Sequence, residues 1–261
     1  MRRVSWAWGL PLVLPLAVLL LWWAVTREAF VAPYLLPSPE SVWLALESYV
    51  AGSPGAGAYQ GRFAGDLAAS LTRVSGGFAL ATAVGLPLGV ASGRMPRLSR
   101  LLSPLVDGLR SVPGICWLPL ALVWLGIGFR TTVFLVAVAA FFPVYLNAAT
   151  GAAAVAPILV RAGSMLGLSP VAVFLRVVLP AAMPHIRAGL RLGLGVGFAY
   201  LVLGELTGVP DGIGAMIMDA RLMGRVDMIL VGILLMSVLG WLGDALLGLV
   251  LRAAFKSARR L

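Results

Sequence analysis

The chain has 261 residues, of which 61% are hydrophobic and only 11% are charged. A soluble domain would carry about 25% charged residues, so this composition indicates an integral membrane protein. The net charge of +10 is of the kind found in nucleic-acid binders. In a membrane protein, however, arginine and lysine gather in cytoplasmic loops. No basic patch interleaved with aromatic residues supports a nucleic-acid partner, so we expect a lipid bilayer and no nucleic acid.

The chain has one cysteine and one histidine. Cys116 lies in an apolar run. Because it is the single cysteine of the chain, it can form neither an internal disulfide nor a cysteine cluster for a metal ion. His185 has no cysteine or second histidine near it in the sequence. An enzyme embedded in the membrane would need several His, Asp or Glu residues at membrane depth. We therefore expect no metal site and no catalytic residues.

Six long apolar stretches alternate with charged segments. A helix needs about 20 apolar residues to cross the hydrocarbon core. The first stretch is longer than the apolar core of a signal peptide and has no good cleavage site, so we expect it to be retained. Prolines within the third stretch predict that this span is broken. In a single transmembrane domain of residues 1–261, the predicted spans are residues 4–26, 74–93, 101–129, 131–150, 188–207 and 228–250.

The charges on the connecting segments predict the orientation. Cytoplasmic loops carry an excess of arginine and lysine. The segment after the second span carries three basic residues and no acid: Arg94, Arg97 and Arg100. Acidic residues gather instead in segments 27–73 and 208–227, which we place outside. We therefore expect both termini in the cytoplasm, together with the long loop 151–187 between the fourth and fifth spans.

Two Ser-Pro pairs predict the starts of short helices outside the spans. A serine side chain can accept a hydrogen bond from a free N–H of the first turn, and proline at the first helical position lacks an N–H that would be unpaired anyway. Ser38-Pro39 lies in the outer segment, and Ser169-Pro170 lies in the cytoplasmic loop. We expect Leu179-Pro180 to end the second helix, because proline disfavours a helical residue before it.

The helix that starts at Ser169 has an apolar face. Four residues follow at the i, i+3, i+4, i+7 spacing of one helix face: Val171, Phe174, Leu175 and Val178. Gly163 and Gly167 most simply allow a tight turn between this helix and the one before it. On the pattern alone, the segment is either an interfacial helix in the lipid headgroups or a plug that docks into a soluble partner. A cytoplasmic location favours the plug, because a partner with a groove can reach it there.

The same loop resembles that of a known family. In the inner-membrane subunits of binding-protein-dependent ABC importers, this loop has the pattern EAA, three residues, Gly, nine residues, Ile-x-Leu-Pro. Here Gly167 is followed, at that spacing, by Val177-Val178-Leu179-Pro180, whereas the EAA part reads Arg161-Ala162-Gly163. The family's glutamate is replaced by Arg161, which reverses the charge available for a contact with an ATPase. Further segments look like the nitrate, sulfonate and taurine branch: residues 35–43, 111–128, 139–147, 180–195 and 212–221.

The resemblance implies an all-α type I ABC importer permease fold, with six transmembrane helices and a cytoplasmic coupling helix between the fourth and fifth. It also implies a homodimer in the bacterial inner membrane, a cytoplasmic ABC ATPase dimer, and a periplasmic or lipid-anchored solute-binding protein. The expected solute is a small anion such as an aliphatic sulfonate, taurine or nitrate. The residues that would couple to the ATPase are Arg161, Ala162, Gly163, Gly167, Val171, Phe174, Leu175, Val178, Leu179 and Pro180.

Energy would have to come from the partner subunits. The chain has no phosphate-binding loop of the G-x-x-x-x-G-K-[ST] type. ATP and Mg²⁺ would therefore be bound by the ATPase, and we expect no cofactor in this chain. The alternative function is a stand-alone secondary transporter or channel. Such carriers often contain internal repeats, and we find no convincing repeat here; in a carrier, moreover, the basic loop would have no role.

Five residues are candidates for the solute pathway: Asp107, Arg110, Trp117, Trp124 and Glu205. An ionisable residue at membrane depth is a functional candidate by default. We expect Asp107 and Arg110 to pair, with direct solute contact as the alternative, and we place Arg110 on the inner side. Trp117 and Trp124 are seven residues apart and share a face, which either packs or lines a cavity. Glu205 either bonds a backbone or hydroxyl group, or acts as a gate or as a contact for the binding protein.

Overall fold

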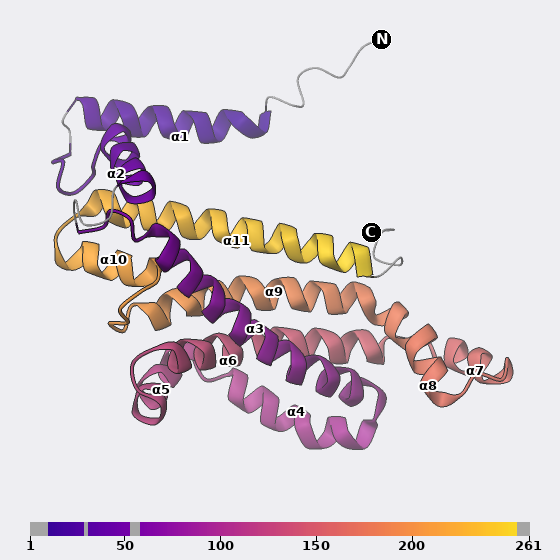
Figure 1. The fold of residues 1–261 in the computed structure, drawn as a ribbon. Helices are drawn as coiled ribbons and strands as arrows, with labels where there is room; N and C mark the ends of the chain where they lie inside the picture. Colours follow the sequence, from indigo (N-terminus) through magenta and orange to yellow (C-terminus); the bar gives the residue numbers. More distant parts are fainter. Residues whose placement is uncertain (1–9, 29–30, 53–57, 255–261) are drawn as a thin grey trace, which may run out of the picture. The chain divides into compact units, whose positions relative to one another are not determined.

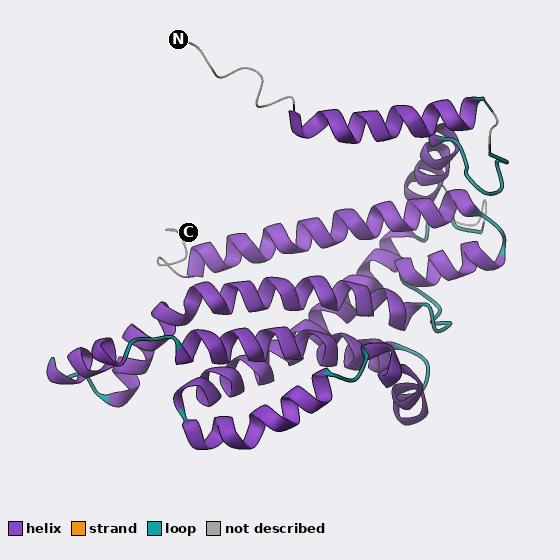
Figure 2. Cartoon of the chain, turned by 180° about the vertical axis from the view of Figure 1, so that it is seen from behind, coloured by secondary structure: helices purple, strands orange, loops and turns teal. Residues whose placement is uncertain are grey.

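The computed structural model describes residues 10–28, 31–52 and 58–254, and all regular structure in these residues is helical (Figure 2). They form two compact units. The first unit comprises the described residues up to Asp66 together with Met216–Leu235, and the second comprises Leu67–Ala215 with the described residues from Met236 onward. The ends of the chain that we predicted to be cytoplasmic lie outside the described residues.

The helices are labelled in Figure 1, apart from two short segments, a 3₁₀ turn η1 and a π-helical turn η2. In chain order, the elements are α1 Leu10–Arg27, α2 Pro39–Ala51, α3 Phe63–Arg94, α4 Pro96–Arg110, η1 Gly114–Cys116, α5 Trp117–Leu125, α6 Phe129–Ala153, α7 Pro157–Met165, α8 Pro170–Val173, η2 Phe174–Val178, α9 Leu179–Glu205, α10 Ile213–Leu222 and α11 Val226–Ala254.

Within the described residues, four helices are long and apolar enough to cross a membrane. They are α3, α6, the continuous run Pro170–Glu205, and α11. Four of the predicted ranges lie largely within these helices. Of the predicted first span, residues 10–26 are helical in α1, and the remainder lies outside the described residues.

The predicted third span, residues 101–129, is not one helix. The chain forms α4, then η1 and α5, and the helix pair Pro96–Arg110 and Gly114–Leu125 is bent by 84°. Pro113 lies at this break, where its missing N–H donor prevents α4 from continuing. Counted together, the bent pair would make a fifth span. The prolines thus predicted the break, and the structure gives its place and angle.

The core of the second unit lies between α6 and α9, which run side by side (Figure 1). Glycines on α9 allow this close approach: a Cβ atom at Gly193 would lie 3.1 Å from the carbonyl oxygen of Ala140, and one at Gly189 would lie 2.9 Å from that of Pro143. Small residues at helix interfaces are the usual device for packing within a membrane, where no hydrophobic effect drives helices together. The paired α6 and α9 give a firm support for the segments attached to their ends.

Candidate functional site

The loop between α6 and α9 contains α7, which ends in a glycine turn. Gly167 has φ +78°, and the N–H of Leu168 donates to the carbonyl of Gly163 at 3.2 Å. The N–H of Gly167 donates to Ser164 O at 3.0 Å, which completes a Schellman cap. Gly167 therefore lies in the turn, as expected. Gly163 lies instead inside α7. Because it has no side chain, Val173 can pack closely against it: a Cβ atom at Gly163 would lie 3.3 Å from Val173 Cγ2.

The helix after this turn starts where the sequence predicted but does not end there. Ser169 Oγ accepts from the N–H of Ala172 at 3.3 Å, which confirms the cap. The expected stop at Leu179-Pro180 is wrong, because the chain stays helical through η2 into α9. In η2 the N–H of Leu179 donates to Phe174 O, five residues back. This wider turn accommodates Pro180, which has no N–H and would clash with a carbonyl in a regular helix.

The apolar face of this segment is smaller than predicted. Val171 is 67% exposed, Phe174 38% and Leu175 53%, and these three side chains form an apolar surface that we call the α8 patch. Val178 is only 3% exposed and belongs to the core of the second unit, so it was wrongly assigned to this surface. Figure 1 shows α7 and α8 together at one end of α9. Arg161 and Ala162 are exposed on α7.

Asp107 and Arg110 form the expected ion pair. Arg110 Nε lies 2.9 Å from Asp107 Oδ1, and both side chains are about half exposed. Arg110 is the last residue of α4, which begins at Pro96. It therefore lies about 15 Å along the helix axis from Arg100, the nearest residue of the basic segment 94–100. The location of Arg110 on the inner side of the membrane stays a prediction.

Arg110 lines a cavity of 160 Å³ together with Trp117 and Tyr200. The indole Nε1 of Trp117 is buried and has no hydrogen-bond partner among the described residues. The Tyr200 hydroxyl lies so close to Gly114 that a Cβ there would be 1.6 Å from Tyr200 Oη. The other lining residues are mainly apolar side chains from α6 and α9: Leu135, Val138, Ala139, Phe142 and Val196. We call this cavity the Arg110 pocket.

Trp117 and Trp124 line a common cavity, which is not the Arg110 pocket. Trp117 and Trp124 both line a larger apolar cavity of 460 Å³ beside the Arg110 pocket, which Trp117 also lines. Trp124 is 63% exposed. Tyr200 was not predicted as a pathway residue. Nothing in the apolar stretch around it indicates that α9 brings it to the end of α4.

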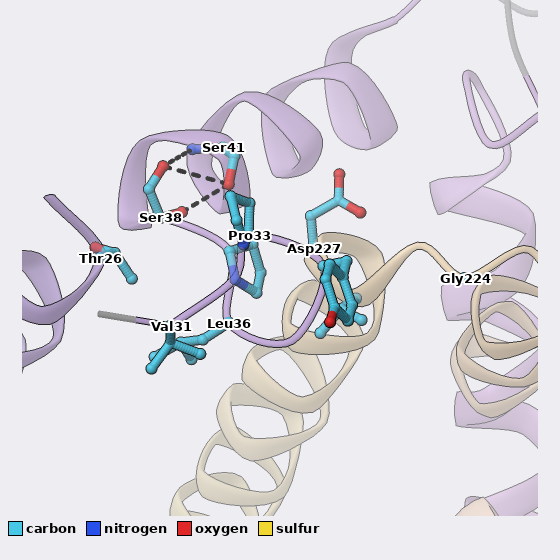
Figure 3. Close-up of a pocket in the computed structure, with 11 residues that line it drawn as sticks. Thr26, Val31, Pro33, Leu36, Ser38, Ser41, Gly224 and Asp227 are labelled. Atoms are coloured by element: carbon cyan, nitrogen blue, oxygen red, sulfur yellow. Dashed lines mark hydrogen bonds between the residues drawn. The ribbon is translucent and has the colours of Figure 1, made fainter. Parts of the chain in front are cut away.

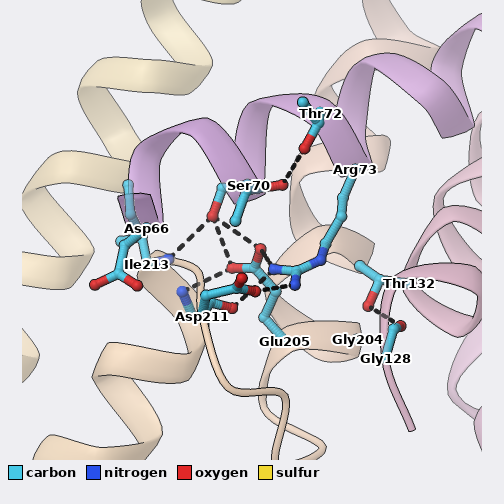
Figure 4. A network of polar contacts seen from close by, with 12 residues as sticks. Asp66, Ser70, Thr72, Arg73, Gly128, Thr132, Gly204, Glu205, Asp211 and Ile213 are labelled. Atoms are coloured by element: carbon cyan, nitrogen blue, oxygen red, sulfur yellow. Dashed lines mark hydrogen bonds and ion pairs between the residues drawn. The ribbon is translucent and has the colours of Figure 1, made fainter. Parts of the chain in front are cut away.

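Glu205 lies in a different place, at the centre of a buried polar network (Figure 4). Its side chain is fully buried. Ser70 Oγ lies 2.8 Å and 2.9 Å from its two oxygens, Arg73 Nη1 donates at 2.9 Å, and the N–H of Gly214 donates at 2.8 Å. Three donors from α3 and α10 therefore satisfy this carboxylate, which makes Glu205 a structural tie.

The same network closes the loop between α9 and α10. Arg73 also donates to the backbone oxygen of Asp211 at 2.8 Å and forms an ion pair with the Asp211 carboxylate. Gly212 has φ +115°, and a Cβ atom at this position would lie 2.5 Å from Glu205 Oε1. Only glycine fits at this turn.

The first unit has its own pocket of 340 Å³, lined by residues from the α1–α2 connection and the start of α11 (Figure 3). Ser38 and Ser41, hydrogen-bonded at the start of α2, line it. Among the described residues that line it, Asp227 alone is charged, and Arg225 Nε donates to Asp227 Oδ1 at 2.9 Å. This hydrogen bond raises the pKa of Arg225, which therefore stays charged beside Asp227. With an acid as its only charge, the pocket is poorly suited to an anion.

A multi-pass helical chain with short helices between two spans is typical of a transport subunit. Residues 85–256 match the family described as binding-protein-dependent transport system inner membrane component. The chain is 35% identical over 247 residues to the taurine transport system permease protein TauC of Escherichia coli (strain K12), covering 92% of this chain and 89% of that protein. The chain therefore belongs to this family and is a permease subunit of an ABC importer.

Other relatives carry names from the same group of transporters. The chain is 32% identical to the putative aliphatic sulfonates transport permease protein SsuC of Bacillus subtilis (strain 168), over 98% of this chain and 89% of that protein. It is 33% identical to the nitrate import permease protein NrtB of Synechocystis sp. (strain ATCC 27184 / PCC 6803 / Kazusa), over 67% of this chain and 64% of that protein. Inward-facing structures of the MetNI methionine ABC transporter share the fold, with TM-score 0.63, 21% identity and coverage of 73% of this chain and 95% of that chain.

Proposed function

We propose that two copies of this chain form the pathway of an importer for a small oxyanion such as an aliphatic sulfonate, taurine or nitrate. The observation that carries this proposal is the Arg110 pocket. Its cation, its unpaired indole N–H and a tyrosine hydroxyl can all donate to an anion. The relatives named above are permeases for taurine, sulfonates and nitrate, all of which carry a group with three terminal oxygens.

The size and polarity of the Arg110 pocket fit such a group. Its 160 Å³ correspond to the liquid volume of about five water molecules, which suits a small solute. A planar guanidinium binds oxyanions through two parallel hydrogen bonds, and Arg110 contacts Asp107 through its Nε. The apolar side chains around it lower the local dielectric and strengthen this attraction. The pocket is thus a candidate subsite on the pathway.

The α8 patch supports coupling to cytoplasmic ATPase subunits. Three exposed apolar side chains on a short helix outside the spans are costly in water and are stabilised when a partner covers them. The patch is joined to α9 without a helix break, so movement of the partner would be transmitted to α9 as a rigid element. ATP and Mg²⁺ would be held by the ATPase, a solute-binding protein would deliver the anion, and both termini would be cytoplasmic in the inner membrane.

The first test is purification of the tagged chain from its native membrane in mild detergent, with its companions identified by mass. We expect recovery of a P-loop ATPase in equal amount, together with a solute-binding protein. Vesicles containing this complex should take up labelled taurine or an alkanesulfonate only when ATP is supplied. If the chain is recovered alone and transports without ATP, it is a secondary carrier.

Substitutions in the α8 patch test the coupling. Phe174→Asp or Leu175→Asp should abolish ATPase copurification, because each places a charge in the docking surface. Leu222→Asp is the matched control, since Leu222 is 75% exposed on the opposite predicted side of the membrane. Arg161→Glu should leave the complex intact if docking is mainly apolar. ATPase recovery with Phe174→Asp would show that the α8 patch is not the docking surface.

A further inference from the structure

We infer that a basic pocket between α9 and α11 binds the headgroup of an anionic phospholipid. The pocket has a volume of 330 Å³ and lies within the second unit. Its lining residues come from two helices: Arg187 and Arg191 from α9, and Asp244, Ala245, Gly248, Leu249 and Arg252 from α11. We call it the Arg252 pocket. This inference does not depend on which solute the importer carries.

Helical spacing explains why these residues meet. Arg187 and Arg191 are four residues apart, so they lie one above the other on α9. Asp244, Gly248 and Arg252 are also spaced by four and form a stripe along α11. Arg191 Nε donates to Asp244 Oδ1 at 2.6 Å, which ties the two stripes together.

The charge of the Arg252 pocket favours an anion. Three arginines and one aspartate line it, which leaves a formal excess of two positive charges. The ion pair with Arg191 accounts for the single aspartate. Arg187 acts electrostatically on the same carboxylate, so the excess of two positive charges belongs to the three arginines together. A phosphodiester group can accept hydrogen bonds from two guanidinium groups at once, so it suits this arrangement.

The surroundings of the Arg252 pocket favour a lipid over a small free anion. Leu246, Leu249 and Val250 are 63%, 62% and 54% exposed, and they continue the pocket as an apolar surface on α11. Only 17% of the most apolar window of α11 is buried, compared with 50% for α6. In a membrane protein such a surface faces acyl chains. The pocket therefore offers a phosphate site and a tail site side by side, as an amphiphile requires.

The depth of the pocket is consistent with a headgroup. Arg252 lies near the end of α11, about 12 Å along the axis from Asp244. Long arginine side chains near the ends of spans extend toward the interface, where lipid phosphates lie. Basic pockets between transmembrane helices on the cytoplasmic side are known to bind anionic headgroups. Arg252 would meet the phosphate first, and Arg187 would hold it from α9.

The test uses the full chain, purified with its partner subunits, and native mass spectrometry in detergent. Phosphatidylglycerol and phosphatidylcholine are added at matched concentrations, and the retained lipid is counted at rising collision energy. We expect selective retention of phosphatidylglycerol. Replacing Arg187 or Arg252 by glutamine should lower that retention about fivefold for each arginine removed. Arg97→Gln and Arg100→Gln, at exposed arginines outside the pocket, should leave it unchanged.

A second pair of variants fills the pocket without changing its charge. A Cβ atom at Gly248 or at Gly240 would meet no other atom within 4 Å, so these two positions on α11 accept a larger residue. Gly248→Leu places a side chain inside the Arg252 pocket, and Gly240→Leu places one outside it. We expect the first variant to lose phosphatidylglycerol and the second to retain it, with equal thermal stability.

Three results would overturn the inference. Equal retention of phosphatidylglycerol and phosphatidylcholine would show that no headgroup is selected. Displacement of the lipid by inorganic phosphate or taurine, but not by chloride at equal ionic strength, would assign the pocket to free anions. Loss of a dimer in the Gly248→Leu variant, with lipid retention unchanged, would assign the surface to a second copy of the chain.

Discussion

Two arginine–carboxylate pairs in this chain have opposite surroundings. The side chains of Arg73 and Glu205 are 5% and 0% exposed, whereas those of Arg110 and Asp107 are 51% and 52% exposed. The buried pair joins segments 132 residues apart, and the exposed pair spans one helical turn. In the buried pair the carboxylate is held by three donors. In the exposed pair one nitrogen of the guanidinium is engaged with its partner.

The difference shows what each pair can do. A buried charge is tolerated only where its partners satisfy it, and removing one partner leaves the other unpaired in a medium that solvates it poorly. The Arg73–Glu205 pair is therefore committed to holding α3, α9 and the following loop together. An exposed pair contributes little to stability. In the function proposed above, Arg110 is therefore the member of these two pairs that would contact the solute, since it lines the Arg110 pocket.

The largest expected effect is the loss of Glu205. Glu205→Ala should destabilise the chain by about 3–5 kcal/mol, because it removes the buried carboxylate partner of Arg73, which keeps Asp211, and leaves the N–H of Gly214 without its acceptor. Asp107→Ala, the matched loss of an exposed carboxylate, should cost about 0–1 kcal/mol. Thermal unfolding of both variants in the same detergent measures the difference. Equal losses would mean that the buried network is not a structural tie.

The sequence allowed only one of these two pairs to be predicted. Asp107 and Arg110 are neighbours on a helix face, so their contact follows from spacing alone. Arg73 directly precedes the predicted span 74–93, and nothing in its local sequence points to Glu205. For Glu205 the sequence left open a bond to a hydroxyl or backbone group, and Ser70 and Gly214 form such bonds. Pairing across 132 residues depends on helix packing, which apolar periodicity does not specify.

A smaller effect is expected at the turn that encloses the buried pair. Gly212→Ala combines a strained positive φ with a contact of 2.5 Å to Glu205 Oε1, and we expect a loss of about 2–3 kcal/mol. Gly208→Ala has the same kind of strain at φ +93° with no atom within 4 Å of the new Cβ, so it should cost about 1 kcal/mol. Comparing the unfolding temperatures of the two variants separates the cost of backbone strain from the cost of the contact with Glu205. Similar values would show that the loop moves away from Glu205.

The fold was predictable where long apolar runs dominate, and less so where prolines interrupt them. Charged boundaries located the stretches that became α3, α6 and α11. Pro180 was expected to stop a helix, but a π-helical turn provides an alternative to stopping. Because the chain stays helical there, Val178 is turned into the core and the α8 patch loses one residue. A proline restricts the hydrogen bonds available to the chain, and packing of the neighbouring side chains decides which solution is adopted.

The smallest expected effects concern the exposed pair and have opposite signs. Arg110→Gln should raise the KM for oxyanion uptake about tenfold, because a charge-assisted contact to the solute is lost. Asp107→Asn should lower the KM about threefold, since the guanidinium is released from its carboxylate and the negative charge beside the pocket is removed. ATP-dependent uptake of labelled solute by vesicles containing the complex measures both values, and kcat and protein stability should change little in either variant. If both substitutions raise the KM equally, Asp107 and Arg110 act as one structural unit, and Arg110 does not bind the solute directly.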